Sequence, residues 1–373
     1  MCAVPTRLGH NRPRLSSPDR SRPGSARGRL VIIVVALLLS ALPAQHSGAQ
    51  EDVRNIAIVA PASRTNQGWD QQGVDNLVQV GAQQDVKVEV ADNAGYDDIT
   101  PILLDLVSNG SQLIVCHASG YQTVCPEFAA SEDVPVVVIE NPGAVSAGRV
   151  SDIETQAQEA AYLAGVMAGN ETRTGTVAIV VTGQPPTWNY MTVGFAEGLK
   201  ASRPDARLVY TSVGEGSYDD AAGAKQVTDT VLAANADIVF GMGDGAAFGM
   251  IQSIRAFNQS RPVEQQARFI DVIGDKSASD AKDFLLTSVL FDYTAAYTQF
   301  IDDLRTGTFG SVYTMDVANG GVRLLAPPIP VRPETTAAVE AARQRILSGG
   351  TAVSAIGDTA GMRARLDALF PKT

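Results

Sequence analysis

Histidine, cysteine and tryptophan are scarce in this chain of 373 residues, which has three, three and two of them. His10 and His46 lie in or beside an N-terminal segment set aside below, so His117 is the one imidazole of the remaining chain. A histidine-rich metal site therefore has no basis in the sequence. The patterns GxSxG, HExxH and GxxxxGK(S/T) are absent, and Cys116 and His117, being adjacent, would point to opposite faces of a strand. We expect no enzyme, no cofactor and no bound metal.

Positive charge is concentrated in the first 29 residues, ahead of an apolar run at 30–44 and the small residues 47–49. The basic side chains of this segment are Arg7, Arg12, Arg14, Arg20, Arg22, Arg27 and Arg29. A basic stretch, an apolar run and small residues in that order are typical of a secretory signal. The run is short for a membrane span of about 20 residues, although an uncleaved anchor is the alternative. We predict a signal peptide at 1–49 and export to the periplasm or cell surface.

The chain that follows the signal is poor in positive charge. Removing seven arginines and one aspartate leaves 22 Lys and Arg against 39 Asp and Glu, a net charge of −17. Such a balance argues against nucleic acid or an anionic membrane surface as a partner. With 45% hydrophobic and only 18% charged residues, the chain has enough apolar material for two domains.

Two cysteines remain beyond the signal, Cys116 and Cys125. Export permits a disulfide, but a spacing of nine positions does not establish the geometry that a disulfide needs. The bridge therefore stays an open possibility at this stage. No cysteine follows the apolar run, so the sequence offers no lipid-attachment site there.

Short apolar runs rich in Val and Ile alternate with longer amphipathic stretches. The predicted strands are 55–60, 86–91, 112–116, 134–139, 176–181, 207–213, 237–242 and 269–274. The predicted helices are 70–83, 98–109, 122–131, 153–170, 189–202, 219–234, 245–258 and 277–284. Near-continuous apolar strands separated by helical patterns are typical of parallel sheets covered on both faces. The fold class is therefore α/β, with doubly wound parallel sheets.

The strand–helix rhythm is interrupted once, after the long helical pattern at 153–170, and starts again at Thr176. This interruption predicts two similar lobes joined by a hinge, an N-terminal lobe at 50–170 and a C-terminal lobe at 171–287. The less regular residues 288–373 contain two short strands near 311–316 and 321–325 and a helix near 333–348. We expect this tail to return to the first lobe, within 288–330, so that the chain crosses between lobes more than once.

Ligands of doubly wound sheets bind outside the carboxyl ends of the strands, and the turns at these ends hold both tryptophans. Trp69 follows the first predicted strand and Trp188 follows the fifth, one in each lobe. A buried tryptophan is often a core anchor. The corresponding positions of the two rings instead favour a planar ligand stacked between them, with Tyr121 and Phe248 nearby.

Polar side chains in the same turns could bind the edges of such a ligand. These are Asn66, Asp70, Asn189, Asp244 and Asp275. Carboxylate oxygens accept hydrogen bonds from ligand hydroxyl or ring N–H groups. An aspartate at a strand-to-helix turn can equally be a helix N-cap, and for Asp244 and Asp275 both interpretations stay open.

The stretch 158-QEAAYLAGVMAGNETRTGTVAIV-180 resembles a segment of the basic membrane protein family, the purine-nucleoside-type substrate-binding proteins of ABC importers. The stretches 193–208, 236–249 and 272–277 are similar to further family segments, and the resemblance extends from about Val53 to Gly350. It implies the type I periplasmic binding fold. It also implies that Trp69 and Phe248 stack on a base, that Asn66 and Asp70 bind it from the first turn, and that Asp275 holds ribose hydroxyls.

The sequence departs from the family pattern at three points. Thr123 stands where nucleoside binders have an aspartate, Phe291 stands where they have a lysine, and the lipoprotein cysteine is missing. The first two changes shift the expected ligand towards a free base or another flat heterocycle.

The sequence thus predicts an exported, monomeric solute-binding protein that delivers a purine base or nucleoside to an ABC permease. Two alternatives stay open. One is a ligand-sensing protein that docks on a receptor, and the other is a binder of a different solute such as a sugar.

Overall fold

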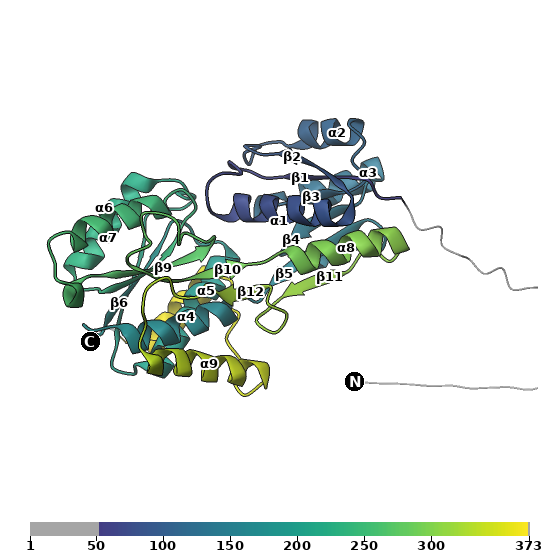
Figure 1. Ribbon diagram of the computed structural model, residues 1–373. Helices are drawn as coiled ribbons and strands as arrows, with labels where there is room; N and C mark the ends of the chain where they lie inside the picture. Colours follow the sequence, from purple (N-terminus) through teal and green to yellow (C-terminus); the bar gives the residue numbers. More distant parts are fainter. Residues whose placement is uncertain (1–51, 372–373) are drawn as a thin grey trace, which may run out of the picture. The chain divides into compact units, whose positions relative to one another are not determined.

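The structure, a computed structural model, describes residues 52–371. The signal-peptide prediction at 1–49 lies outside these residues. Two six-stranded sheets form the described chain, in the orders β11-β5-β4-β3-β1-β2 and β12-β10-β9-β8-β6-β7. Each sheet, with its helices, makes one lobe (Figure 1), so the predicted class of two doubly wound α/β lobes is confirmed.

The N-terminal lobe is built on an all-parallel sheet. Its strands are β1 (Asn55–Val59), β2 (Lys87–Ala91), β3 (Ile114–Cys116), β4 (Val136–Ile139), β5 (Val150–Thr155) and β11 (Val312–Met315). Its helices are α1 (Trp69–Gln84), α2 (Thr100–Ser108), α3 (Val124–Glu132) and α8 (Thr294–Thr306). Successive side chains of a strand point to opposite faces. Ile56 and Ile58 accordingly join a core that includes Leu77 of α1, whereas Ala57 and Val59 join one that includes the side chains of α2 and α3.

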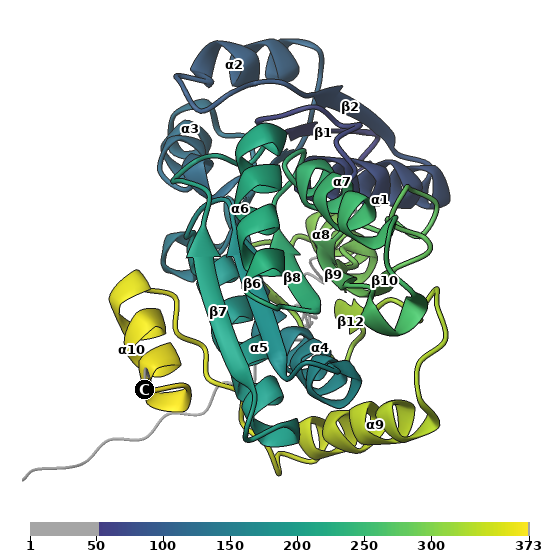
Figure 2. The ribbon, with the colours of Figure 1, turned by 90° about the vertical axis from the view of Figure 1, so that its left-hand side faces the viewer.

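The C-terminal lobe repeats this plan. Its strands are β6 (Thr176–Val181), β7 (Arg207–Ser212), β8 (Ile238–Met242), β9 (Arg268–Ile273), β10 (Leu285–Phe291) and β12 (Val322–Leu324). Its helices are α4 (Ala157–Glu171), α5 (Pro186–Ser202), α6 (Ala221–Ala233), α7 (Ala247–Asn258), α9 (Pro333–Leu347) and α10 (Thr359–Leu369). Only β12 runs antiparallel to its neighbour, β10. Figure 2 looks onto this lobe, with α6 and α7 on the near side of the sheet.

Helices α4 and α5 lie unusually close together, because glycines replace side chains at their contact. A Cβ atom on Gly165 would meet the backbone of Phe195, and one on Gly198 would meet the backbone of Tyr162. Nearly all of α4 is buried. The small residues of the stretch 158–169 therefore belong to helix packing rather than to a ligand site.

The chain crosses between the lobes three times within the described residues, at β5 to α4, β10 to α8 and β11 to β12. Helix α4 packs against α5 and α9, which places it in the C-terminal lobe and puts the first crossing near Gln156 rather than near Asn170. Helix α8 packs against α1, and β11 pairs with β5. Residues 294–315 thus belong to the N-terminal lobe, and α9 and α10 to the C-terminal lobe.

Several predicted element bounds need correction. Residues 150–155 form strand β5 and not the start of a helix, so the helix predicted at 153–170 begins at Ala157. The stretch 277–284 contains turns instead of a helix. Strand β10 (Leu285–Phe291) and helix α10 were not predicted at all. Both missed strands are fully or largely buried, and their short runs merge with the amphipathic segments that follow.

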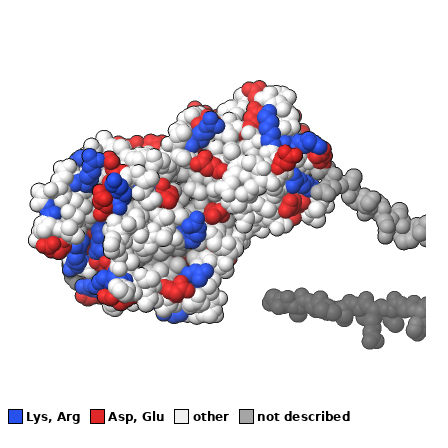
Figure 3. Space-filling model, viewed as in Figure 1, with Lys and Arg blue, Asp and Glu red and all other residues white. Residues whose placement is uncertain are grey.

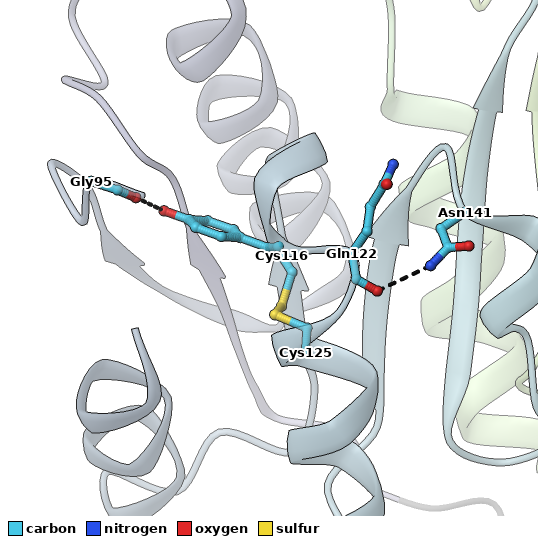
Figure 4. Close-up of a disulfide and its surroundings, with 6 residues drawn as sticks. Gly95, Cys116, Gln122, Cys125 and Asn141 are labelled. Carbon is cyan, nitrogen blue, oxygen red and sulfur yellow. Dashed lines mark hydrogen bonds between the residues drawn. A yellow bond between two sulfur atoms is a disulfide. The ribbon is translucent and has the colours of Figure 1, made fainter. Parts of the chain in front are cut away.

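Cys116 and Cys125 form a disulfide (Figure 4). It joins the end of β3 to the first turn of α3, and both residues are fully buried. Beside it, the Tyr121 hydroxyl donates a hydrogen bond to the Gly95 carbonyl at 2.5 Å, and Asn141 Nδ2 donates to the Gln122 carbonyl at 3.0 Å. The bridge thus fixes a turn at the edge of the cleft described next.

Candidate ligand-binding site

A cavity lies between the two lobes, at the carboxyl ends of β1, β2, β3 and β4 in one lobe and of β6, β7 and β8 in the other. Residues of both lobes line it. The N-terminal lobe contributes Trp69, Asp70, Tyr96, Ala118, Ser119, Ile139 and Glu140. The C-terminal lobe contributes Pro185, Thr187, Trp188, Tyr218 and Asp244. The cavity therefore combines four aromatic rings with three carboxylates.

Trp69 begins α1 and is half-buried. Its ring stacks on His117, with centroids 4.8 Å apart and an interplanar angle of 23°, and Phe291 and Tyr293 meet it edge-on. Its Nε1 donates to the His117 carbonyl at 3.2 Å. Burial lowers the pKa of His117 to about 4, so this imidazole is neutral at physiological pH. Trp69 is thus an anchored ring that also lines the cavity.

Trp188 lies on the opposite lobe, in the first turn of α5, and is 5% exposed. Tyr218 packs against it in a T-shaped arrangement, with centroids 5.2 Å apart. Both rings line the cavity. The two tryptophans of the chain therefore border one cavity from opposite lobes.

Asp70 is buried at 2% exposure and organises the first turn of the cleft. Its Oδ1 accepts from the Ala62 amide at 3.0 Å, and its Oδ2 accepts from Asn66 Nδ2 at 2.8 Å. Burial raises the pKa of Asp70, and these two hydrogen bonds oppose the rise. Asn66 does not line the cavity. Its contribution is to orient Asp70.

Asp244 links the lobes directly. Its Oδ1 accepts a hydrogen bond from the Trp69 amide at 3.1 Å. Burial, together with the charge of Asp70, raises the pKa of Asp244 to about 7, against the opposing effects of the Trp69 amide and of Lys276. A carboxylate of the C-terminal lobe therefore accepts a hydrogen bond from the first backbone amide of helix α1, which belongs to the N-terminal lobe.

Glu140 makes a second link. It follows β4 with a positive φ of 57°, a backbone conformation that costs free energy and that recurs at functional sites. Its carboxylate accepts from the Thr155 hydroxyl at 2.7 Å and from the Thr187 hydroxyl of the C-terminal lobe. Burial raises the pKa of Glu140. Glu140, Thr187, Tyr96 and Tyr218 were not among the predicted site residues, although each lies in or next to a turn that follows a predicted strand.

Five of the predicted site residues lie outside this cavity, namely Asn66, described above, and Tyr121, Asn189, Phe248 and Asp275. Tyr121 is 1% exposed within the N-terminal core, and Asn189 donates to the carbonyls of Gln184 and Gly357, where it fastens the C-terminal tail. Phe248 is on α7, 38% exposed, beside a separate surface groove. Asp275 is exposed and accepts from the Ser277 amide at 2.8 Å. Neither Thr123 nor Phe291 lines the cavity, and Phe291 is fully buried.

Two glycines, Gly68 and Gly274, lie at the contact between the lobes, and each packs against a residue of the other lobe. A Cβ atom on Gly274, after β9, would overlap the backbone carbonyl oxygen of Gln67 in the N-terminal lobe. A Cβ atom on Gly68 would likewise overlap Asp244. Closure of the cleft therefore requires a residue without a side chain at each position.

We expect Gly274→Ala to hold the lobes apart and weaken ligand binding about tenfold or more, because a backbone carbonyl cannot move aside as a flexible side chain can. Gly143→Ala is the matched control, since its Cβ would come no nearer than 3.7 Å to a side-chain oxygen. Small-angle scattering of both variants, with calorimetry, measures the effect. A Gly274→Ala protein that closes and binds as the parent does would contradict this account.

Among residues 52–371, no group of three or more His, Cys, Asp or Glu side chains is arranged to hold a metal ion. Within the same part of the chain, no helix is both long and apolar enough to cross a membrane.

The fold and the cleft define a two-lobe solute-binding protein. The structure is similar to an ABC transporter solute-binding protein from Conexibacter woesei DSM 14684, with a TM-score of 0.69 and 20% sequence identity over 82% of this chain and 100% of that one. Residues 53–356 match the family described as ABC transporter substrate-binding protein PnrA-like. The chain belongs to this family, as its sequence predicted.

Two relatives of this chain have names that describe different roles. The ABC transporter nucleoside-binding protein BmpA of Lactococcus lactis subsp. cremoris (strain MG1363) is 27% identical over 176 residues, which cover 44% of this chain and half of that protein's length. The transcriptional activator protein med of Bacillus subtilis (strain 168) is 24% identical over 302 residues, covering 79% of this chain and 89% of that protein.

Proposed function

We propose that this protein is an extracytoplasmic solute-binding protein that closes its two lobes on a small planar ligand, a purine base or nucleoside, and delivers it to an ABC permease. The observation that carries the proposal is the cavity bordered by Trp69 and Trp188 from opposite lobes. A ligand that contacts both lobes favours the closed arrangement over the open one, because only the closed state offers all its contacts.

The interlobe hydrogen bonds of Asp244 and Glu140 support the same mechanism. Each forms between a side chain of one lobe and a donor of the other, so each is lost when the lobes separate. The cavity also presents carboxylate oxygens, which accept hydrogen bonds from ring N–H, amino or hydroxyl groups. Purines and nucleosides carry such donors at the edges of a flat ring system.

One face of the molecule, shown in Figure 3, lacks the charge pattern of a nucleic-acid-binding surface. On the face shown in Figure 3, basic and acidic side chains are interspersed, without a broad basic area among the described residues. Nucleic-acid binding proteins gather Lys and Arg on one face.

A second candidate is a sensing protein whose closed form docks on a receptor. The match to a transcriptional activator over 79% of this chain favours it. The two candidates share the cavity and the closing motion. They differ only in the partner that recognises the closed form, which is a permease in one case and a receptor in the other. Genes for an ATPase and two permeases beside the gene of this protein would favour transport.

Calorimetry of the purified protein against adenine, hypoxanthine, adenosine, guanosine and simple sugars tests the ligand class. We expect heat and a thermal shift with at least one purine and none with the sugars. Native mass spectrometry of the protein as purified would show a ligand retained from the cell. Binding of a sugar and of no purine would reject the purine proposal while leaving the fold and the binding role intact.

A further inference from the structure

We infer that the interlobe cavity selects a flat or compact cation, such as an N-alkylated heterocycle or a quaternary ammonium compound, over neutral ligands of the same shape. The inference rests on the proposed function, because it concerns the ligand of the same cavity. It goes further by assigning the ligand's charge.

The cavity holds three carboxylates that lack ion-pair partners among the described residues. Asp70 accepts from one amide and one side-chain amide, Glu140 accepts from two threonine hydroxyls, and Asp244 accepts from the Trp69 amide. All of these donors are neutral. The ion pairs of residues 52–371 include none of the three acids.

No lysine, arginine or histidine lines the cavity in the part of the chain that the structure describes. The nearest imidazole, His117, lies behind the Trp69 ring and is fully buried. Lys276 raises the local potential near Asp244, but its ammonium is bonded to Asp271 at 2.5 Å and is fully buried. The cavity is therefore acidic without a compensating positive group on its wall.

Buried acids that lie close together resist ionisation unless a cation joins them. The carboxyl groups show this: burial raises the pKa of all three, and the charge of Asp70 adds to the rise at Asp244. A bound cation would remove this cost, whereas an anionic ligand would increase it.

The walls suit a cation as well. Trp69, Tyr96, Trp188 and Tyr218 line the cavity, and an aromatic face attracts a positive charge through the ring quadrupole. Aromatic rings from both lobes, combined with carboxylates, are the chemistry that binds alkylated ammonium groups. A neutral purine would gain stacking on the same rings but would leave the acids without a counter-charge.

Two matched ligand pairs test the inference by calorimetry. The first is 1-methyladenosine, which is cationic near neutral pH, against adenosine. The second is choline against 3,3-dimethylbutan-1-ol, its neutral isostere. We expect the cation to bind at least about tenfold more tightly than the neutral ligand in at least one pair. A difference of this size is what one favourable charge contact contributes in a site that holds little water. Equal or tighter binding of the neutral member in every pair that binds overturns the inference and leaves the proposed function standing.

Two further outcomes separate the inference from the proposed function. No binding of either pair or of the purine panel would overturn both. Cation-selective binding of choline without any purine would support the inference and reject the purine ligand.

Charge-removing variants locate the effect. Glu140→Gln and Asp244→Asn should each reduce the preference for the cation by about tenfold, while the amides keep the shape of the carboxylates. Asp275→Asn is the matched control, because this acid lies outside the cavity, and the preference should stay unchanged. A preference that survives in both cavity variants would overturn the assignment.

Discussion

Replacing Lys276 with methionine should lower the free energy of unfolding by about 3–5 kcal/mol, the cost of leaving a buried charge without its partner. The Lys276 ammonium and the Asp271 carboxylate are both fully buried and lie 2.5 Å apart. The lysine donates to Asp271 Oδ2, and Asp271 Oδ1 has no hydrogen-bond partner among the described residues. Burial raises the pKa of Asp271, and Lys276 opposes that rise. In the variant, Asp271 must either stay ionised in an apolar site or take up a proton.

Denaturant unfolding of Lys276→Met and of the double variant Lys276→Met/Asp271→Leu measures this cost. The double variant should recover most of the stability, because exchanging a whole buried pair for apolar groups is often neutral. Lys282→Met is the control for losing a lysine, since Lys282 is exposed and surface changes usually stay within about 0.5 kcal/mol. A single variant as stable as the parent would show that the pair contributes nothing.

The fold was accessible from the sequence wherever a strand was a distinct apolar run. The runs at 55–60 and 176–181 are bounded by turn signals, and both form interior strands of their sheets. Strand β5 was missed because Val150–Thr155 contains Ser, Asp and Glu and passes into the helical pattern of α4 after one residue. Whether a partly polar segment forms a buried strand depends on the neighbouring strands of the sheet. The local periodicity of the sequence carries no information about those neighbours.

Tertiary packing also determines the lobe to which α4 belongs. The sequence placed 153–170 with the first lobe because it precedes the interruption near Asn170. The small residues of α4 instead fit against the glycines of α5, a contact between segments that no local pattern pairs.

The candidate site was predictable at the level of turns, and less so at the level of side chains. Rules for parallel sheets locate the cleft at strand ends, and Trp69, Asp70, Trp188 and Asp244 all line it. Neighbours in the same turns point elsewhere: Asn189 follows Trp188 by one position yet is 1% exposed and bonded to the C-terminal tail. Side-chain direction within a turn depends on dihedral angles that the sequence does not state.

Glu140 shows what an additional signal could have been. It directly follows the predicted apolar strand 134–139, at the end of the strand where ligands of such sheets bind, and its backbone has a positive φ. An acid at the carboxyl end of a buried parallel strand is a candidate ligand group by position alone. Its bond to Thr187, which joins the lobes, depends on closure and had no counterpart in the sequence.

Trp188→Ala should weaken binding of the best ligand by at least about 30-fold, because truncating a central aromatic contact commonly costs about 2 kcal/mol or more. The ring is 5% exposed, packs edge-on with Tyr218 and lines the cavity from the C-terminal lobe. The substitution removes one of the two tryptophan rings that border the cavity from opposite lobes. It should also lower the free energy of unfolding by about 3–5 kcal/mol, the usual cost of truncating a buried aromatic side chain. Calorimetry should therefore be run at a temperature where circular dichroism shows the variant folded.

Phe195→Ala provides the matched control, because it separates loss of a wall from loss of stability. Phe195 lies on the same helix, is fully buried, and stacks on Phe240 with centroids 4.4 Å apart, away from the cavity. This variant should lose comparable stability yet bind as the parent does. If both variants weaken binding equally, the effect of Trp188 acts through the fold. If Trp188→Ala binds normally, the ring is a core anchor and the ligand stacks on Trp69 alone.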